Sequence, residues 1–239
     1  MNPRLYLSPP LSKGAERTLD SEDSHYLARV LRLKPGAQLR CFDGEGSEWL
    51  AELTTSNARA IVVTLAKLVR FEHRPNFELH LAQGWLKGQS MDQVVQKATE
   101  LGITDFWPIS AARSKVRIDE SRTYNRMHHW QRIARSATEQ SERLYLPRLH
   151  QPRNLDDFLK RPPCKTLLFL EPGCAALPTD LARQSLVLMV GPEGGWTTEE
   201  RNMAERTNAH LHSLGDLILR AETAPLAALA ALRHGWEWR

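Results

Sequence analysis

The sequence predicts two domains: a small β-barrel over residues 1–72, then an α/β domain with a parallel sheet over residues 73–239. Short β-branched segments dominate the first range, whereas strands alternate with helices from Phe77 onward. Residues 166–170 and 185–190 are continuous apolar runs, which are typical of strands buried on both faces of a parallel sheet. Because such sheets bind ligands beyond the carboxyl ends of their strands, we expect the functional site there.

The first domain contains one predicted helix and three strand-like segments that a barrel would close. Apolar residues at helical spacing predict a helix over residues 24–33, and the Lys-Pro-Gly at 34–36 ends it. The Asp-Gly-Glu-Gly at 43–46 is a hairpin signal between two strands. Residues 70–76 have mixed charge and a proline, and we expect them to form the linker. The apolar stripe of the helix is Leu27, Val30 and Leu31; the strands are 38–42, 48–53 and 60–69.

The second domain begins with a strand over residues 77–81 and a helix. Ser90 is the predicted N-cap of this helix, Gln93 occupies the capping-box position, and Gly102 ends it. Its apolar stripe consists of Met91, Val94, Val95, Ala98 and Leu101. The next elements are a strand over 103–109 and a long helix around Trp130, Ile133, Ala134, Ala137 and Leu144 that ends before Pro147.

The composition is that of a globular protein, with 41% hydrophobic and 25% charged residues. Lys and Arg exceed Asp and Glu by 32 to 28, which favours a polyanionic partner only weakly. Three cysteines without a C-x-x-C pair support neither a disulfide framework nor a cysteine zinc site, which fits the cytoplasm. Neither the His128-His129 pair nor His210 with His212 has a third ligand at metal spacing, so we expect no metal. No stretch reaches the roughly 18 apolar residues of a membrane span, and we expect no membrane partner.

Positive charge is concentrated in residues 113–153, which contain ten Lys or Arg and four Asp or Glu. Such a stretch can face the phosphates of a nucleic acid. It can equally form the solvated face of a helix, because charge runs usually serve solubility.

A glycine-rich loop follows the second apolar run directly. Residues 191–196 read GPEGGW, and Thr197 with Glu200 then has the pattern of a capping box that opens a helix. The three glycines permit positive φ and leave main-chain amides and carbonyls uncovered, so a flat ligand such as adenine can lie against them. An ordinary tight turn has the same composition. The loop matches neither the dinucleotide fingerprint nor the P-loop.

A second loop occurs about twenty residues later. A short strand around residues 210–214 leads into GDLILRAETAP at 215–225, where Pro225 suits the first turn of a helix. Arg220 and Glu222 place donors and a carboxylate beside the amino end of that helix. The alternative is a capped helix with a surface ion pair.

These residues resemble one family closely. GPEGGW followed by TTEE, with LGDLILRAETA farther along, is similar to the paired cofactor loops of the small-subunit (16S) ribosomal RNA uridine-N3 methyltransferase family in the SPOUT superfamily. The resemblance covers nearly the whole chain, because further blocks match in the same order. They are HYLARVLRLKPG, FDGEG, WLKGQSMDQVVQKATELGI and HWQRIARSATEQSERLYLP.

The resemblance implies a PUA-like barrel followed by a SPOUT domain tied in a trefoil knot. It also implies a cytoplasmic homodimer that methylates small-subunit ribosomal RNA with S-adenosylmethionine, releases S-adenosylhomocysteine and needs no metal. By motif, the cofactor-binding residues are Leu170, Gly191, Pro192, Glu193, Gly194, Gly195, Leu214, Gly215, Leu219, Thr223 and Ala224.

Chemistry at uridine N3 sets further expectations, because this atom bears a proton and lies on the Watson–Crick edge. The base must therefore be unpaired, and its proton must leave. We expect Arg220 to stabilise charge on the uracil, and Glu222 or Glu139 to orient or accept the proton. Expected RNA contacts are the basic residues of the matching blocks: Arg29, Arg32, Lys34, Lys87, Arg113 and Arg143.

One position departs from the family pattern, since Leu217 stands where the family usually has an arginine. Arg220 keeps its expected place, so we expect activity to be retained. Two alternatives stay open: another SPOUT methyltransferase that acts on transfer RNA or on a ribose 2'-hydroxyl, and a noncatalytic RNA-binding assembly factor. A ribose methylase would be expected to carry a different glycine loop, and a pure binder would not need both loops.

Overall fold

The computed structural model describes residues 2–55, 57, 59–114, 120–178 and 180–236, without the side chains of 120–122. They form two compact units, each with its own core. The first unit comprises Met1–Arg74 and Thr138–Leu146; the second comprises Pro75–Ala137 and Pro147–Arg239. The sequence-based domains do not include the return of residues 138–146 to the first unit.

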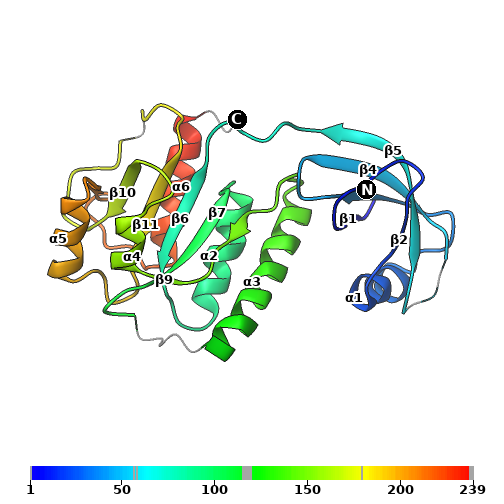
Figure 1. The fold of residues 1–239 in the computed structure, drawn as a ribbon, viewed down its shortest axis with the longest axis horizontal. Helices are drawn as coiled ribbons and strands as arrows, with labels where there is room; N and C mark the ends of the chain where they lie inside the picture. The colour runs from blue at the N-terminus through cyan, green and yellow to red at the C-terminus, as the bar shows by residue number, and fades with distance from the viewer. Residues whose placement is uncertain (1, 56, 58, 115–119, 179, 237–239) are drawn as a thin grey trace. The chain divides into compact units, whose positions relative to one another are not determined.

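A curved five-stranded sheet forms the first unit, in the order β1-β3-β4-β5-β2 (Figure 1). β1 runs parallel to β3, and the other neighbours are antiparallel. Two register shifts between β4 and β5 increase the local twist. The three strands expected from the sequence are present, whereas β1 and β2 are too short to show periodicity. The strands are β1 (Arg4–Tyr6), β2 (Glu16–Thr18), β3 (Gln38–Phe42), β4 (Ser47–Leu53) and β5 (Val62–Phe71).

The predicted helix over 24–33 has a different form. α1 (Ser21–His25) begins at Asp20, whose carboxylate accepts a hydrogen bond from the main-chain N–H of Asp23, and it continues as a π-helical turn, η1 (Tyr26–Val30). The change of helical period buries Leu27 and leaves Val30 and Leu31 exposed. Only part of the predicted apolar stripe therefore belongs to the core. Residues 31–37 then lead into β3.

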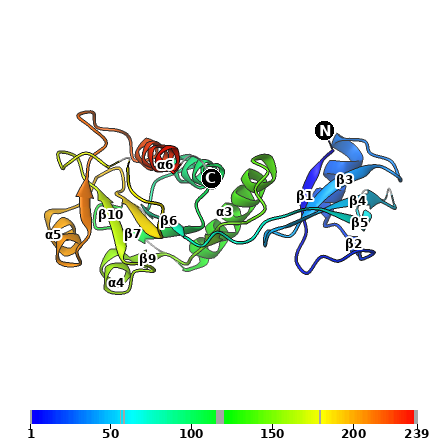
Figure 2. The ribbon, with the colours of Figure 1, turned by 90° about the horizontal axis from the view of Figure 1, so that it is seen from above.

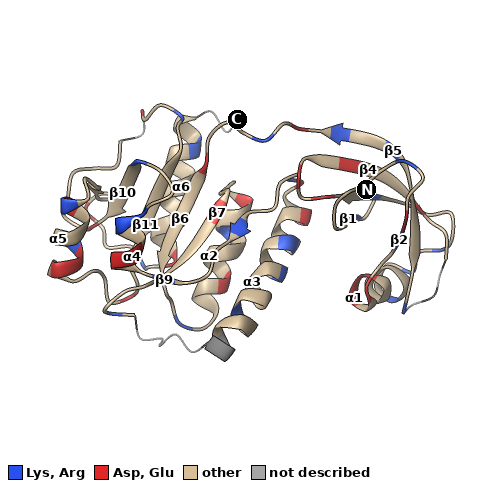
Figure 3. Cartoon of the chain, viewed as in Figure 1, with Lys and Arg blue, Asp and Glu red and all other residues tan. Residues whose placement is uncertain are grey.

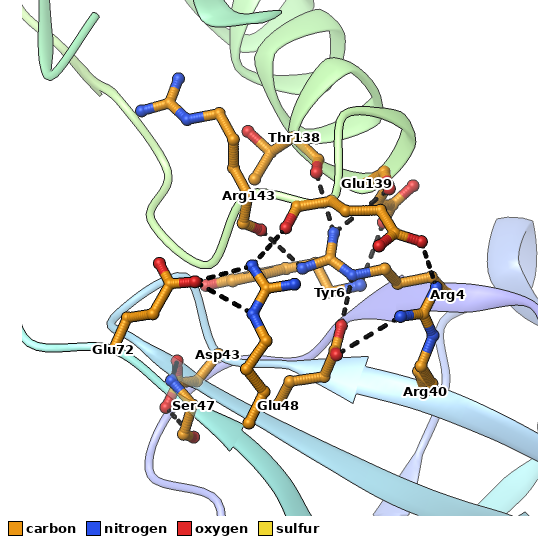
Figure 4. A network of polar contacts seen from close by, with 12 residues as sticks. Arg4, Tyr6, Arg40, Asp43, Ser47, Glu48, Glu72, Thr138, Glu139 and Arg143 are labelled. Atoms are coloured by element: carbon orange, nitrogen blue, oxygen red, sulfur yellow. Dashed lines mark hydrogen bonds and ion pairs between the residues drawn. The ribbon is translucent and has the colours of Figure 1, made fainter. Parts of the chain in front are cut away.

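Arg4 attaches the returning segment, residues 138–146, to the sheet of the first unit (Figure 4). Its guanidinium pairs with the buried carboxylate of Glu48 at 2.5 Å. The Glu139 carboxylate accepts a hydrogen bond from the main-chain N–H of Tyr6 at 3.0 Å. Burial lowers the pKa of Arg4, although Glu48 opposes this effect. The guanidinium of Arg4 also donates to main-chain oxygens of Thr138, Glu139 and Arg143.

A seven-stranded parallel sheet forms the centre of the second unit, in the order β12-β10-β11-β6-β7-β8, and β9 also pairs with β7. The two apolar runs form β10 and β11, which lie next to each other and are buried almost throughout, as predicted. The strands are β6 (Leu79–Gly84), β7 (Asp105–Ser110), β8 (Arg148–Leu149), β9 (Arg153–Asn154), β10 (Thr166–Leu170), β11 (Leu186–Val190) and β12 (His210–His212).

Helices cover both faces of this sheet (Figure 2). Leu188 of β11 belongs to the core shared with α2, α3 and α6, whereas its neighbour Val187 belongs to the core shared with α4 and α5. No helix in the described part of the chain is long and apolar enough to cross a bilayer. The helices are α2 (Gln89–Glu100), α3 (Glu120–Gln140), α4 (Leu155–Lys160), α5 (Thr198–Arg206) and α6 (Thr223–Gly235).

In the second unit, helix ends agree with the sequence except at two places. The predictions that Ser90 caps α2 and that Gln93 occupies a capping-box position are wrong, because the helix begins at Gln89 and Gly88 occupies the cap without a side-chain hydrogen bond. The long helix α3 ends at Gln140 rather than after Leu144, and Glu142 has φ +57°. The predicted stops and caps elsewhere are confirmed: Gly102 follows α2 with φ +92°, and Thr197 and Glu200 form the capping box of α5.

Candidate functional site

A pocket of about 600 Å³ lies in the second unit beyond the carboxyl ends of β10, β11 and β12. Three segments form most of its wall: the end of β10 with Glu171 and Pro172, the glycine loop after β11, and the loop between β12 and α6. The main-chain N–H of Glu171 donates to the carbonyl of His212 at 2.8 Å, which joins the ends of β10 and β12. The two loops identified in the sequence therefore meet in one cavity.

Side chains beneath the glycine loop hold it in shape. The amide nitrogen of buried Gln83 donates to the carbonyl of Gly191 at 3.1 Å, and the indole of Trp196 donates to the carbonyl of Leu170 at 3.2 Å. A Cβ atom on Gly84 would collide with the main chain of Pro192, so glycine at the end of β6 permits this close approach. Within the loop, the N–H of Gly195 donates to the carbonyl of Pro192.

The loop that follows β7 holds the glycine loop from outside. The guanidinium of Arg113 donates to the carbonyls of Gly194 and Trp196, both at 3.0 Å. The main-chain N–H of Ala112 donates to the buried carboxylate of Glu200 at 2.7 Å. The guanidinium of Arg113 pairs two carbonyls of the loop, and together the three bonds hold the loop in shape without a ligand.

The β12–α6 loop contributes the more exposed wall. Gly215 has φ +103°, which only glycine adopts readily. Arg220 and Glu222 line the pocket, and their charged groups lie 3.9 Å apart. The carbonyl of Arg220 accepts the N–H of Thr223 and of Ala224, which starts α6.

Comparison with known proteins identifies the family. Residues 73–233 match the family model of an RNA methyltransferase domain, and residues 19–66 match that of an RNA methyltransferase PUA domain. The ribosomal RNA small subunit methyltransferase E of Synechocystis sp. is 33% identical over 237 residues, which cover 96% of this chain and 76% of that protein. The chain belongs to the ribosomal RNA small subunit methyltransferase E family.

A further relative and two solved structures agree with the match. The Bacillus subtilis enzyme is 29% identical, with 92% of this chain and 90% of that protein covered. The crystal structure of the Neisseria gonorrhoeae enzyme bound to S-adenosyl methionine has a TM-score of 0.88 and 32% identity, with 98% of both chains covered. A Legionella pneumophila putative methyltransferase in complex with the same cofactor gives 0.91 and 31%, again over 98% of both chains. The expected PUA-like and SPOUT architecture is confirmed.

The chemistry of the residues that line the pocket suits S-adenosylmethionine. Gly191, Gly195 and Gly215 leave main-chain groups accessible in a cavity large enough for a nucleoside. His212 lines the same wall, and its buried Nδ1 has no hydrogen-bond partner among the described residues. Burial raises the pKa of Glu171, and Arg201 and Arg113 offset this in part. Its carboxylate suits a ligand that carries positive charge.

The predicted cofactor residues mostly lie in this pocket. Gly194 and Thr223 are absent from the wall, and Gly194 instead packs against Arg113. The rest line it: Leu170, Gly191, Pro192, Glu193, Gly195, Leu214, Gly215, Leu219 and Ala224.

The other predicted site residues are distributed over both units. Arg220 and Glu222 line the pocket, whereas Glu139 belongs to the first unit and binds Tyr6 there. The exposed Lys87 donates its main-chain N–H to the carboxylate of Glu193 at 2.9 Å. Arg113 uses its guanidinium on the glycine loop. The remaining expected RNA contacts lie in the first unit: Arg29, Arg32, Lys34 and Arg143.

Several residues of the wall are not predicted from the sequence. Glu171 was detectable, because it directly follows a buried strand that ends beside the glycine loop. Ser90 also lies on the wall, whereas the sequence predicts it only as the N-cap of α2. No pattern marked Leu217 and Ile218 as pocket residues, because apolar residues in a loop do not show whether they are exposed.

One cluster has metal-binding residue types: Glu78, His80 and Asp105, at the start of β6 and β7. Arg148 occupies it, donating to Asp105 at 2.8 and 2.9 Å and to Glu78 at 2.5 Å. His150 bonds the same carboxylate of Asp105 at 2.6 Å. Burial raises the pKa of Asp105, but the bonds from His150 and Arg148 outweigh it and hold this pKa well below its usual range. The arrangement is that of an ion-pair network around the buried carboxylate of Asp105.

Proposed function

We propose that this protein transfers a methyl group from S-adenosylmethionine to N3 of a specific uridine in 16S ribosomal RNA of the small subunit. The observation that carries the proposal is the meeting of the two loops in one main-chain pocket, with Arg220 and Glu222 on its wall. Relatives that are 29% and 33% identical over most of the chain bear the name ribosomal RNA small subunit methyltransferase E. The specific nucleotide atom follows from the resemblance of both loops.

S-adenosylmethionine supplies a methyl group already activated on a sulfonium. The work left to the protein is alignment, charge stabilisation and removal of one proton. The S–CH3 bond breaks as the N3–CH3 bond forms, and the N3 proton passes to a carboxylate. Glu222 is the candidate acceptor because it lines the pocket, whereas Glu139 belongs to the first unit and its carboxylate accepts from the main-chain N–H of Tyr6. Arg220 stabilises the negative charge that develops on the uracil carbonyls.

Basic residues of both units support RNA binding in this proposal. Arg29, Arg32 and Lys34 are exposed around η1 in the first unit. Basic side chains also recur along α3 (Figure 3). Of the basic run over 113–153, Lys115 and Arg117 lie outside the described residues. We expect the affinity for RNA to fall steeply with salt concentration.

We also propose a role for each domain, a cellular compartment and an oligomeric state. Residues 1–72 act as the RNA-binding domain and residues 73–239 as the methyltransferase domain. The protein acts in the cytoplasm as a homodimer.

Mass spectrometry of nucleosides tests the proposal. Small subunits and naked ribosomal RNA from cells that lack the gene are incubated with the protein and with S-adenosylmethionine labelled in its methyl group. We expect labelled 3-methyluridine at one position. Label on a ribose hydroxyl, or in transfer RNA only, would support a different SPOUT methyltransferase. RNA binding without any binding of S-adenosylmethionine would support an assembly factor.

A further inference from the structure

Two adjacent aliphatic side chains on the pocket wall are almost fully exposed. Leu217 is 80% exposed and Ile218 is 84% exposed, more than any other large apolar side chain among the described residues. Single exposed apolar residues need no explanation, but two neighbours at the mouth of a ligand pocket are a different case. Their exposure costs free energy that a bound partner would recover.

The neighbours of this pair restrict what can cover it. Arg220 lies on the same loop, also lines the pocket, and its side chain is 86% exposed. A purely apolar partner would cover Leu217 and Ile218, but it would also remove water from this guanidinium without replacing its hydrogen bonds. The partner must therefore offer an apolar face and, beside it, hydrogen-bond acceptors.

A uracil base has this combination, with flat apolar faces and carbonyl oxygens on its edge. A base that leaves its helix for methylation at N3 loses its stacking neighbours, and enzymes of this kind replace them with aromatic or apolar side chains. We propose that Leu217 and Ile218 form an apolar clamp against the face of the extruded target uracil, while Arg220 meets its carbonyl edge. The inference rests on the proposed function and adds the residues that hold the base.

Position supports this occupant. The clamp residues line the same cavity as Gly191, Gly195 and Gly215, where the cofactor fits. A base held at Leu217 and Ile218 therefore lies at the open side of the cofactor pocket, where its N3 can face the methyl group. The other candidate is a second copy of this chain, which the test separates by oligomeric state.

The test compares the full chain with the double variant Leu217→Ser/Ile218→Ser. Leu217→Met/Ile218→Leu is the conservative variant, and Asn202→Ser, exposed on α5 of the same unit, is the surface control. Methylation of small-subunit RNA, calorimetric binding of S-adenosylmethionine and sedimentation are measured for each. We expect kcat/KM for RNA to fall about tenfold or more in the double Ser variant, as for loss of base stacking, with cofactor affinity and oligomeric state unchanged. The conservative variant should recover most of the loss, and the control should match the wild type.

Three results would overturn the clamp. Unchanged kcat/KM in the double Ser variant would show that the side chains do not touch the base. A shift in oligomeric state would assign them to a second copy, and a parallel loss of cofactor affinity would assign them to the cofactor. The proposed function fails separately: wild-type protein that forms no 3-methyluridine would overturn both, whereas 3-methyluridine with unaffected variants would reject the clamp alone.

Discussion

The indole of Trp196 donates a 3.2 Å hydrogen bond to the carbonyl oxygen of Leu170, which links the glycine loop after β11 to the end of β10. The same ring stacks on Phe169 with 4.7 Å between ring centroids, and Trp196 is almost fully buried. A tryptophan directly after GPEGG thus fixes the loop by packing below the pocket. The main-chain groups above it are held in place for a ligand.

Arg113 should control cofactor affinity through the glycine loop. Arg113→Ala removes the two bonds to the carbonyls of Gly194 and Trp196, so we expect the affinity for S-adenosylmethionine to fall about tenfold. Calorimetry measures this, with Arg206→Ala, exposed at the end of α5, as the control. If affinity for RNA alone fell, Arg113 would be an RNA contact and no anchor of the loop.

Arg220 should affect turnover more than binding. Arg220→Ala removes a positive charge from the place where the uracil becomes negative, so we expect kcat to fall about 100-fold. Cofactor affinity should stay within about twofold, because the loop is held by its main chain. Single-turnover kinetics and calorimetry separate the two quantities. An equal loss of both would assign Arg220 to the cofactor pocket.

Glu171 should make cofactor binding depend on pH. Because burial raises its pKa, this carboxyl loses its proton at a higher pH than an ordinary glutamate. Only the deprotonated form attracts a sulfonium, so affinity for S-adenosylmethionine should rise as pH increases through this raised pKa. Glu171→Gln should flatten the profile and lower affinity at neutral pH about fivefold. Glu199→Gln, on exposed α5, should keep the wild-type profile; a flat wild-type profile would contradict the assignment.

Asp105 should stabilise the second unit at neutral pH but not at strongly acidic pH. Its pKa is held below the usual range, so its contribution is present above about pH 4 and is lost as pH falls through the lowered pKa. At neutral pH, Asp105→Asn should lower the free energy of unfolding by about 3 kcal/mol, because Arg148 and His150 lose a buried partner. Urea unfolding between pH 3 and pH 8 measures this.

The control for this stability prediction is Asp156→Asn, which breaks the exposed pair of Asp156 with Lys160 on α4. This change should have little effect on unfolding at any pH. A loss in Asp105→Asn that stays constant down to pH 3 would show that packing, and not charge, explains the effect.

Local chemistry made much of the second unit predictable from the sequence. The apolar run at 185–190 fixes where the strand ends, and the Thr197–Glu200 capping box fixes where the helix begins. The glycine loop must therefore connect the end of β11 to the start of α5. Because parallel sheets bind ligands beyond the carboxyl ends of their strands, the pocket is expected at the end of β11. The neighbouring strand β10 ends at the same edge and also lines the pocket. These features depend on near neighbours in the chain.

Features that depend on distant contacts were not predictable. The return of residues 138–146 to the first unit relies on Arg4, more than 130 residues earlier. The π-helical turn at Tyr26–Val30 alters the period that the apolar spacing indicates. The exposure of Leu217 and Ile218 depends on the course of a whole loop, which no spacing of apolar residues reveals.

Hydrogen–deuterium exchange with and without S-adenosylmethionine reports whether the cofactor binds the main-chain groups of the two loops, because the method follows main-chain amides. Added cofactor should slow exchange at amides of residues 191–195 and 214–221, which belong to the two loops. Slower exchange confined to other segments, or no change at saturating cofactor, would show that the two loops do not bind the cofactor.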